Sequence, residues 1–334
     1  MRHPAAVRTS LAALAGMSLL LTACGSSGAP SATSGTGSTA GVVDVVASTN
    51  VYGDIAAIIG GDRVNVTSII TKTSQDPHSY EATAQDRLLV SKAELVIENG
   101  GGYDTFLHKM ADDSNIDHAN ILTAVELSGL APEEVHAEST ASAASEPAGE
   151  HGNAHEHGDF NEHVWYSLDA MSRLADAVAV KLGELEPGSA ATFTENAAAF
   201  KSEIGGLNGT LAALKDRGVS ASVAVTEPVP LYLLEAAGLE NRTPADYTAA
   251  IEEGSDVPPT ALKAATDLAG SKDISFLAYN EQTEGPQTEA LKRAAESAGV
   301  PVINFSETLP EGKTYLQWMT DNVENVSKVL EKNS

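Results

Sequence analysis

The chain of 334 residues has very little cysteine and few basic side chains. Cys24 is the only cysteine, which excludes a disulfide framework and a thiolate metal site, so any metal site must use nitrogen and oxygen ligands. Only 20 lysine and arginine residues accompany 46 carboxylates, and the formal net charge is −26. An acidic chain repels nucleic-acid phosphates and attracts cations, so we expect no nucleic-acid partner.

Two common hydrolase motifs are also absent. The sequence has no HExxH, the zinc motif of many metallopeptidases, and no GxSxG, the nucleophile motif of α/β-hydrolases. We therefore do not expect an enzyme. A secreted zinc-dependent hydrolase, in which two histidines and a carboxylate leave one position open for water, is the enzymatic alternative.

The N-terminal segment has the pattern of a signal peptide. The apolar run Leu11–Leu21 is too short to span a bilayer, and the basic residues Arg2 and Arg8 precede it. The segment then reads LTAC, which resembles a bacterial lipobox with the lone cysteine at the lipidated position. We predict a lipoprotein signal peptide over residues 1–23 and lipidation of Cys24. A plain secretory signal is the alternative.

Residues 24–41 consist mostly of Ser, Gly, Thr and Ala, a composition typical of a flexible tether. With Cys24 lipidated, this tether would hold the folded body a short distance from the extracytoplasmic face of the cell membrane. We expect that body to be a monomer.

From residue 42 onward, strand and helix patterns alternate. Apolar runs rich in β-branched residues predict strands, and amphipathic runs predict the helices between them. This rhythm indicates βαβ units with parallel-type sheets, first over residues 42–187 and again over residues 218–334. The predicted strands occupy residues 42–47, 64–70, 95–98, 120–125, 219–225, 274–279 and 300–305, with a further short strand at 164–166.

One helical run is much longer than its neighbours. Between residues 190 and 215 apolar side chains recur at three- and four-residue spacing, and a helix of this length would measure about 40 Å. We predict an α/β fold with two α/β lobes joined by a long rigid backbone helix over residues 188–217. Ligands of open α/β sheets bind beyond the carboxyl ends of the strands, so the expected site is the cleft between the lobes.

An acidic stretch over residues 133–163 contains five of the nine histidines and eight carboxylates, without any lysine or arginine. Imidazole and carboxylate are common ligands of divalent cations. We interpret residues 133–160 as a loose metal-collecting loop whose histidines are His136, His151, His155 and His157. His163 follows beside apolar residues that can pack, which makes it a candidate for a fixed ligand. A solvated acidic loop with incidental histidines is the alternative.

Other polar residues follow other predicted strands. His78 comes after the second strand in the loop QDPHSYE, where Pro77 restricts the backbone. Glu227 ends the first strand of the second lobe, and Glu281 and Glu284 follow a later strand. Because these strand ends are expected to face the same cleft, their side chains can meet there.

Four of these features together resemble one family, the substrate-binding lipoproteins of zinc/manganese ABC importers, which have a rigid interdomain helix. The features are the DPHxYE loop at His78, the NxHVW motif at His163, the acidic His-rich loop, and the strand-ending carboxylate Glu227. The resemblance extends over residues 42–330.

The resemblance implies a receptor that captures a divalent metal ion and delivers it to the permease of an ABC importer. It implies that His78 and His163 are metal ligands, completed by Glu227 and by a fourth carboxylate, Glu284 or Glu281. The His-rich loop favours Zn²⁺ as the bound substrate, with Mn²⁺ as the alternative and no organic cofactor. A surface adhesin is a further alternative.

The sequence departs from the family pattern at several positions. Glu162 stands where a proline is usual before the second histidine, and Glu227 stands where zinc receptors commonly have a third histidine. The usual fourth-ligand aspartate has no clear match, although Glu284 fits the segment's proline slightly better than Glu281. A set of two imidazoles and two carboxylates suits either zinc or manganese.

Overall fold

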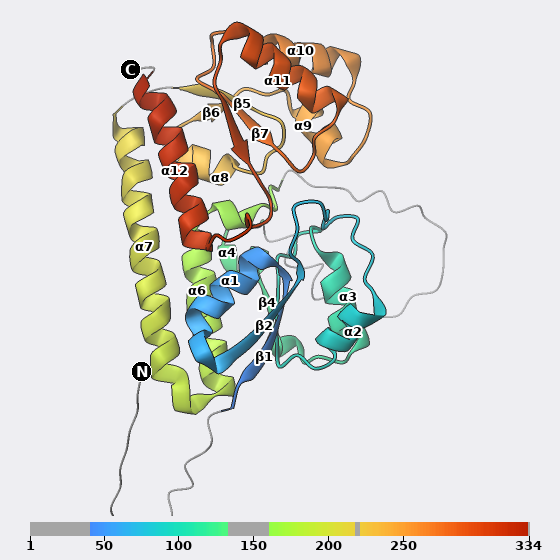
Figure 1. The fold of residues 1–334 in the computed structure, drawn as a ribbon, viewed down its shortest axis with the longest axis vertical. Coiled ribbons are helices and arrows are strands. Elements are labelled where there is room, and N and C mark those ends of the chain that lie inside the picture. Colours follow the sequence, from blue (N-terminus) through green and yellow to red (C-terminus); the bar gives the residue numbers. More distant parts are fainter. Residues whose placement is uncertain (1–40, 133–159, 218–220, 333–334) are drawn as a thin grey trace, which may run out of the picture. The chain divides into compact units, whose positions relative to one another are not determined.

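The computed structural model describes residues 41–132, 160–217 and 221–332 (Figure 1). These residues fall within one compact unit, Ser38–Ser334. The predicted signal peptide, its lipidation site and nearly all of the predicted tether lie outside the described residues. The same is true of His136, His151, His155 and His157 in the predicted metal-collecting loop.

The first sheet has four parallel strands in the order β2-β1-β3-β4. Its strands are β1 Val43–Thr49, β2 Val64–Ile70, β3 Leu95–Glu98 and β4 Ile121–Thr123. Val45 of β1 pairs with Val66 on one side and with Leu95 on the other. Interior parallel strands are covered on both faces, which agrees with the burial of every residue of β3 and of all but one residue of β1.

Helices connect these strands, and a glycine turn follows β3. The helices are α1 Asn50–Gly60, α2 Ala84–Val90, α3 Thr105–Asp113 and α4 Ala124–Ser128, with 3-10 turns at Gly61–Arg63 and His118–Asn120. Gly100, Gly101 and Gly102 all have positive φ, a conformation that side chains disfavour. The turn allows the carboxylate of Asp104 to accept hydrogen bonds from the backbone N–H groups of Asn99 and Gly100.

The second sheet is also parallel, with the strand order β6-β5-β7-β8. Its strands are β5 Ser222–Val225, β6 Glu240–Asn241, β7 Leu277–Asn280 and β8 Val302–Phe305. The helices that accompany it are α8 Leu231–Ala236, α9 Ala245–Glu252, α10 Pro259–Ala269 and α11 Pro286–Ala298. The sequence patterns did not predict α9 or α10, which are short and rich in alanine.

Three long helices, α6 Leu168–Leu185, α7 Ala190–Asp216 and α12 Tyr315–Lys332, complete the described fold. The 27-residue α7 is about 40 Å long and packs against α6, α1 and α12 (Figure 1). Its buried Phe200 belongs to a hydrophobic cluster that also contains Val45 of the first sheet and Val223 of the second. The predicted fold class, two α/β lobes with parallel sheets, is confirmed.

One predicted strand is wrong. Val164–Tyr166 form a 3-10 helix, η3, in which the N–H of Tyr166 donates to the carbonyl of His163 and that of Ser167 donates to the carbonyl of Val164. Val, Trp and Tyr all favour strands, but here their side chains are buried against the core without a neighbouring strand to pair with.

A further 3-10 turn, Pro187–Ser189, joins α6 to α7. None of the helices in the described ranges combines the length and the apolar composition that a membrane span needs.

Candidate metal centre

His78 lies in the loop that follows β2, and Asp76 fixes the shape of this loop. Oδ1 of Asp76 accepts a hydrogen bond from the backbone N–H of His78 at 2.9 Å, and Oδ2 accepts one from Oγ of Ser79 at 2.7 Å. The ring of Tyr103 stands edge-on to the imidazole, with 5.0 Å between the centroids. The Asp76 turn and the Tyr103 ring together hold His78 in place.

His163 immediately precedes η3 and is only 2% exposed. Oδ1 of Asn161 accepts a hydrogen bond from the backbone N–H of His163 at 3.1 Å and lies 2.7 Å from Nδ1 of the ring. Since an amide oxygen can only accept, we assign the ring proton to Nδ1, which leaves the Nε2 lone pair for a metal. Burial, followed by the nearby His78, lowers the pKa of His163 to about 3, so the ring is neutral at physiological pH.

The segment after β5 holds Asn161 in turn. Nδ2 of Asn161 donates a hydrogen bond to the carbonyl of Pro228 at 3.0 Å, and the hydroxyl of Tyr232 donates one to the carbonyl of Asn161 at 2.6 Å. These hydrogen bonds connect the backbone beside His163 to the segment that follows Glu227.

Two buried carboxylates follow strands of the second sheet, Glu227 after β5 and Glu307 after β8, and each is 5% exposed. Nδ2 of Asn280 donates hydrogen bonds to Oε1 of Glu307 at 2.7 Å and to Oε2 of Glu227. The hydroxyl of Tyr103 donates to Oε2 of Glu307 at 3.2 Å, and that of Thr283 donates to Oε2 of Glu227. In the described ranges, the ion pairs of lysine and arginine all involve other carboxylates.

Without a cation, these two carboxylates hold their protons unusually well. Burial raises the pKa of Glu227 to about 7 and that of Glu307 to about 8, and the charge of Glu227 is the second cause for Glu307. When these two buried carboxylates ionise, a divalent ion would neutralise their charge.

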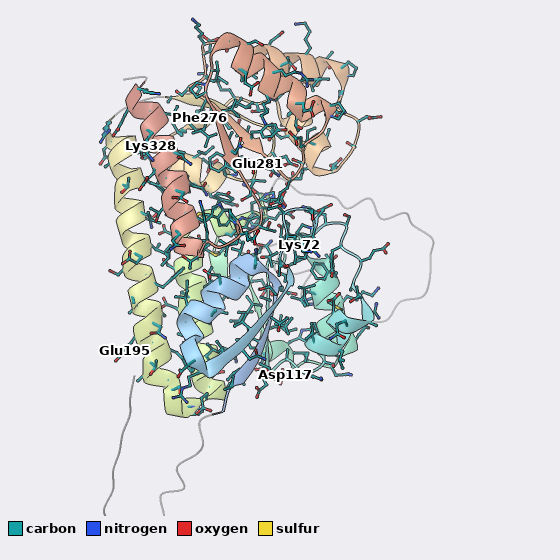
Figure 2. All side chains as sticks on the ribbon, viewed as in Figure 1. Lys72, Asp117, Glu195, Phe276, Glu281 and Lys328 are labelled. Atoms are coloured by element: carbon teal, nitrogen blue, oxygen red, sulfur yellow. The ribbon has the colours of Figure 1, made fainter. Side chains whose placement is uncertain are left out.

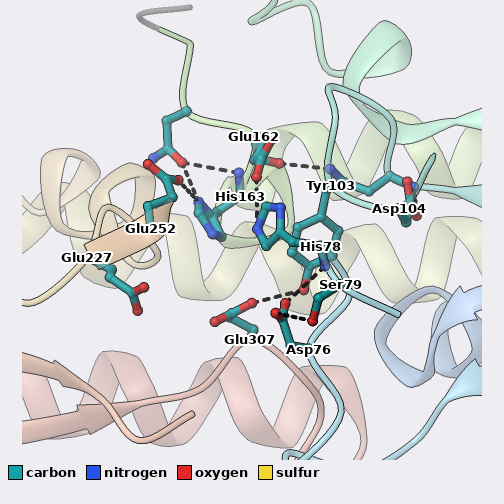
Figure 3. A network of polar contacts seen from close by, with 12 residues as sticks. Asp76, His78, Ser79, Tyr103, Asp104, Glu162, His163, Glu227, Glu252 and Glu307 are labelled. Atoms are coloured by element: carbon teal, nitrogen blue, oxygen red, sulfur yellow. Dashed lines mark hydrogen bonds and ion pairs between the residues drawn. The ribbon is translucent and has the colours of Figure 1, made fainter. Parts of the chain in front are cut away.

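The donor atoms of His78, His163 and Glu307 lie within 4.8 Å of one another (Figure 3). Metal–ligand distances of about 2.0–2.3 Å place the donors of one ion at most about 4.5 Å apart, so small side-chain adjustments bring these three onto a common ion. Glu227 is not part of this triad but is linked to Glu307 through Asn280. The residues come from three separate loops, two of them at the carboxyl ends of strands in different sheets.

Comparison with known proteins identifies the family. The family model described as zinc-uptake complex component A, periplasmic (ZnuA), matches residues 45–329. The chain belongs to this family. The predicted resemblance is therefore confirmed.

Relatives of this ZnuA family member include receptors named for different metals. The manganese ABC transporter substrate-binding lipoprotein scaA of Streptococcus gordonii is 24% identical over 94% of this chain and 97% of its own length. The zinc-binding lipoprotein AdcA of Streptococcus pneumoniae is 22% identical over 82% of this chain but only 53% of its own length. The structure of FpvC from Pseudomonas aeruginosa in complex with Mn²⁺ matches 88% of this chain and 100% of that chain, with a TM-score of 0.67 and 21% identity, and has the same fold.

The structure places the other two predicted ligands outside the cluster. Glu284 is more than half exposed, accepts a hydrogen bond from the Tyr279 hydroxyl at 3.3 Å and lies 4.0 Å from Nζ of Lys292. Glu281 accepts a hydrogen bond from Asn304 and is exposed. Neither belongs to a group of converging donors among the described residues.

Glu307 lies beside His78 and His163, and sequence reasoning missed it. Glu307 comes two residues after the end of β8. It could therefore have been found by the same signal as Glu227, a carboxylate just after a strand. A polar residue after a strand is common, however, and the sequence does not say which one faces inward.

Two more carboxylates approach the histidines. Donor atoms of Glu162, His163 and Glu252 lie within 4.8 Å of one another, and Oε1 of Glu162 lies 3.2 Å from Nε2 of His78 (Figure 3). Burial raises the pKa of Glu162 to about 9 and that of Glu252 to about 7. Glu252 was missed because it ends α9, a helix that the sequence patterns did not predict.

A separate histidine–carboxylate pair stabilises the first sheet. Nδ1 of His108 on α3 lies 3.0 Å from Oε1 of the buried Glu98, which also accepts a hydrogen bond from Thr123 at 2.9 Å. The hydrogen bond to Glu98 is the main cause that raises the pKa of His108 to about 9. Because the pKa of His108 is higher in the folded protein than in the unfolded chain, the protonated ring stabilises the fold. This stabilisation is fully present below the unfolded-chain pKa of about 6.5 and is lost as the pH rises through about 9.

We therefore expect the variant His108→Gln to lower the free energy of unfolding at pH 6 and to do so much less at pH 10. Urea unfolding of both proteins at the two pH values measures this difference. An equal loss at pH 6 and pH 10 would show that the charge of His108 does not stabilise the fold.

Proposed function

We propose that this chain is an extracytoplasmic solute-binding lipoprotein that captures a divalent metal ion and delivers it to the permease of an ABC importer. The observation that carries the proposal is the convergence of His78, His163 and Glu307 within 4.8 Å. The ZnuA family consists of solute-binding proteins of ABC importers rather than enzymes, and its members scaA and AdcA are named as metal-transport or metal-binding lipoproteins.

The proposed ligands are His78, His163, Glu227 and Glu307. Asn280 and Thr283 both bind Oε2 of Glu227, so we assign Oε1 as the oxygen that reaches the metal. The ion takes the place of the protons that the two carboxylates retain in its absence, and the neutral His163 gives up no proton from Nε2.

The proposed cargo is Zn²⁺, the ion predicted from the His-rich sequence, since two nitrogens and two oxygens satisfy its tetrahedral preference. Mn²⁺ is the second candidate. The observation that favours it is the presence of Glu162 and Glu252 beside the same histidines, because harder ions prefer oxygen donors.

Metal analysis of the protein purified from its native host, followed by competitive titration with Zn²⁺ and Mn²⁺, tests these assignments. Bound zinc and the tighter affinity for Zn²⁺ support the first candidate, whereas bound manganese supports the second. A protein that carries neither ion and binds neither tightly would contradict the proposed function.

We further propose that Cys24 anchors a monomer to the membrane through its lipid. The support is the LTAC tetrapeptide together with the lipoprotein names of the relatives. Mass spectrometry of the mature protein is expected to find a lipidated cysteine at its N-terminus, and size-exclusion chromatography of the unanchored body is expected to find one copy. An unmodified N-terminus at another residue would contradict the anchor.

The predicted collecting loop lies outside the described residues, and we expect it to be dispensable for tight binding. Deleting residues 138–157 removes His151, His155 and His157 but none of the four proposed ligands. Calorimetric titration with Zn²⁺ should therefore retain one tight site and lose only weak additional binding. Loss of the tight site on deletion would show that the loop supplies a principal ligand.

A further inference from the structure

Glu162 is a buried carboxylate in a position that the proposed ligand set does not use. It stands between Asn161 and His163 and is 3% exposed. Its carbonyl accepts hydrogen bonds from Nδ2 of Asn99 at 3.1 Å and from the N–H of Val164 at 2.7 Å. These hydrogen bonds hold the backbone of Glu162 in place.

The glycine turn after β3 passes close to this side chain. A β-carbon on Gly101 would lie 3.4 Å from Cβ of Glu162, and one on Gly102 would lie 3.6 Å from Oε2. The side chain is therefore packed beneath this turn, on the side where His78 and His163 lie (Figure 3).

Oε1 of Glu162 is buried and has no hydrogen-bond partner among the described residues. Its distance to Nε2 of His78 is 3.2 Å, close enough for an ion pair. Two donors bound to one metal at about 2.1 Å each, with an angle of about 90–110° between them, lie about 3.0–3.4 Å apart. The spacing of Oε1 and Nε2 is that of neighbouring ligands of one ion.

The charges around Glu162 also call for a cation. Glu252 lies in the same donor group, and neither carboxylate forms an ion pair with a described lysine or arginine. Buried carboxylates without a lysine or arginine partner are costly, and a metal ion at His78 would be a strong partner for Glu162.

We propose that Glu162 is an additional metal ligand, which joins the four proposed ligands and favours Mn²⁺ over Zn²⁺ relative to the same site without it. This inference rests on the proposed function. Zinc sites are usually complete with four ligands, whereas manganese prefers oxygen donors and octahedral geometry. A further carboxylate therefore improves the manganese complex more than the zinc complex.

The test compares the wild type with Glu162→Gln, which keeps the shape of the side chain and removes its charge. Competitive titrations measure the affinity of each protein for Zn²⁺ alone and for Mn²⁺ alone. We expect the variant to lose about tenfold or more in Mn²⁺ affinity, a loss of the size that ligand-supporting residues produce, and to lose clearly less in Zn²⁺ affinity. X-ray absorption of the Mn²⁺ complexes should show one oxygen donor fewer in the variant.

Glu195→Gln is the matched control, because Glu195 is an exposed glutamate on α7 (Figure 2). It should bind both ions as the wild type does, and thermal melting of all three metal-free proteins verifies that they fold. Tighter binding of both ions by Glu162→Gln would show that Glu162 competes with the metal for His78, and unchanged binding would show that Glu162 is not a ligand; either result overturns the inference. An equal loss for both ions overturns its role in selectivity.

A parallel titration of His78→Ala separates this inference from the function beneath it. If His78→Ala loses tight binding and Glu162→Gln does not change the ratio of the two affinities, the receptor function stands and only the role of Glu162 fails. If His78→Ala still binds tightly, the proposed site itself fails.

Discussion

Replacing His78 with alanine is expected to weaken Zn²⁺ binding by about 100-fold or more. Loss of a residue that merely supports a ligand costs about 10–100-fold in metal affinity, and loss of a ligand should cost at least as much. His78 lies in the loop after β2 and is the member of the His78–His163–Glu307 group that follows a strand of the first sheet. Without it, no strand end of the first sheet would supply a proposed ligand. Titration against a chelator of known affinity measures the effect.

His118→Ala is the control for this experiment. His118 is 65% exposed and bonds to Asp112, and it belongs to neither group of converging donors. Its replacement should leave Zn²⁺ affinity unchanged. Comparable affinities for His78→Ala and His118→Ala would remove His78 from the ligand set.

The metal-free protein is expected to lose stability as the pH rises, and bound metal is expected to restore it. The pKa is raised from 4.5 to about 9 for Glu162, to about 8 for Glu307, and to about 7 for Glu227 and Glu252. With folded-state pKa values above the unfolded values, the folded protein retains protons that the unfolded chain releases. The free energy of unfolding therefore falls as the pH increases from about 4.5 through about 9.

A divalent ion replaces those protons, so its stabilising effect should increase with pH. An ion at 1,000 times its Kd adds about 4 kcal/mol, which for a chain of this size corresponds to a Tm increase of about 6 °C. Scanning calorimetry at pH 5.5 and pH 8.5, with and without Zn²⁺, measures both trends.

Glu307→Gln provides the comparison for these melts. The variant lacks one of the carboxylates whose pKa is raised. Its metal-free form should therefore lose less stability between the two pH values than the wild type does. A wild-type metal-free protein that melts at the same or a higher temperature at pH 8.5 would contradict this account of the buried charges.

Much of the fold could be predicted from the sequence because its longer strands and helices have clear apolar patterns. The β-branched runs at β1 and β2 and the long periodic run of α7 have patterns that few other structures produce. Short elements were harder. Val164–Tyr166 have strand-forming side chains but form a 3-10 turn, since tertiary packing overrides local preference in so short a segment.

The candidate site could be predicted only in part. His78 and His163 each stand in a distinctive local sequence, and the structure brings them together. The carboxylates depend on side-chain direction, which sequence spacing does not reveal. Asn280 points inward to Glu227 and Glu307, whereas Glu281, the next residue, points outward to Asn304.

The central claim is that one divalent ion is held by His78, His163, Glu227 and Glu307. Anomalous diffraction at the zinc edge, from crystals of the protein loaded with one equivalent of Zn²⁺, tests it most directly. We predict a single strong peak, bonded to both imidazoles and both carboxylates at about 2.0–2.2 Å. A peak that contacts neither His78 nor Glu307 would contradict the account.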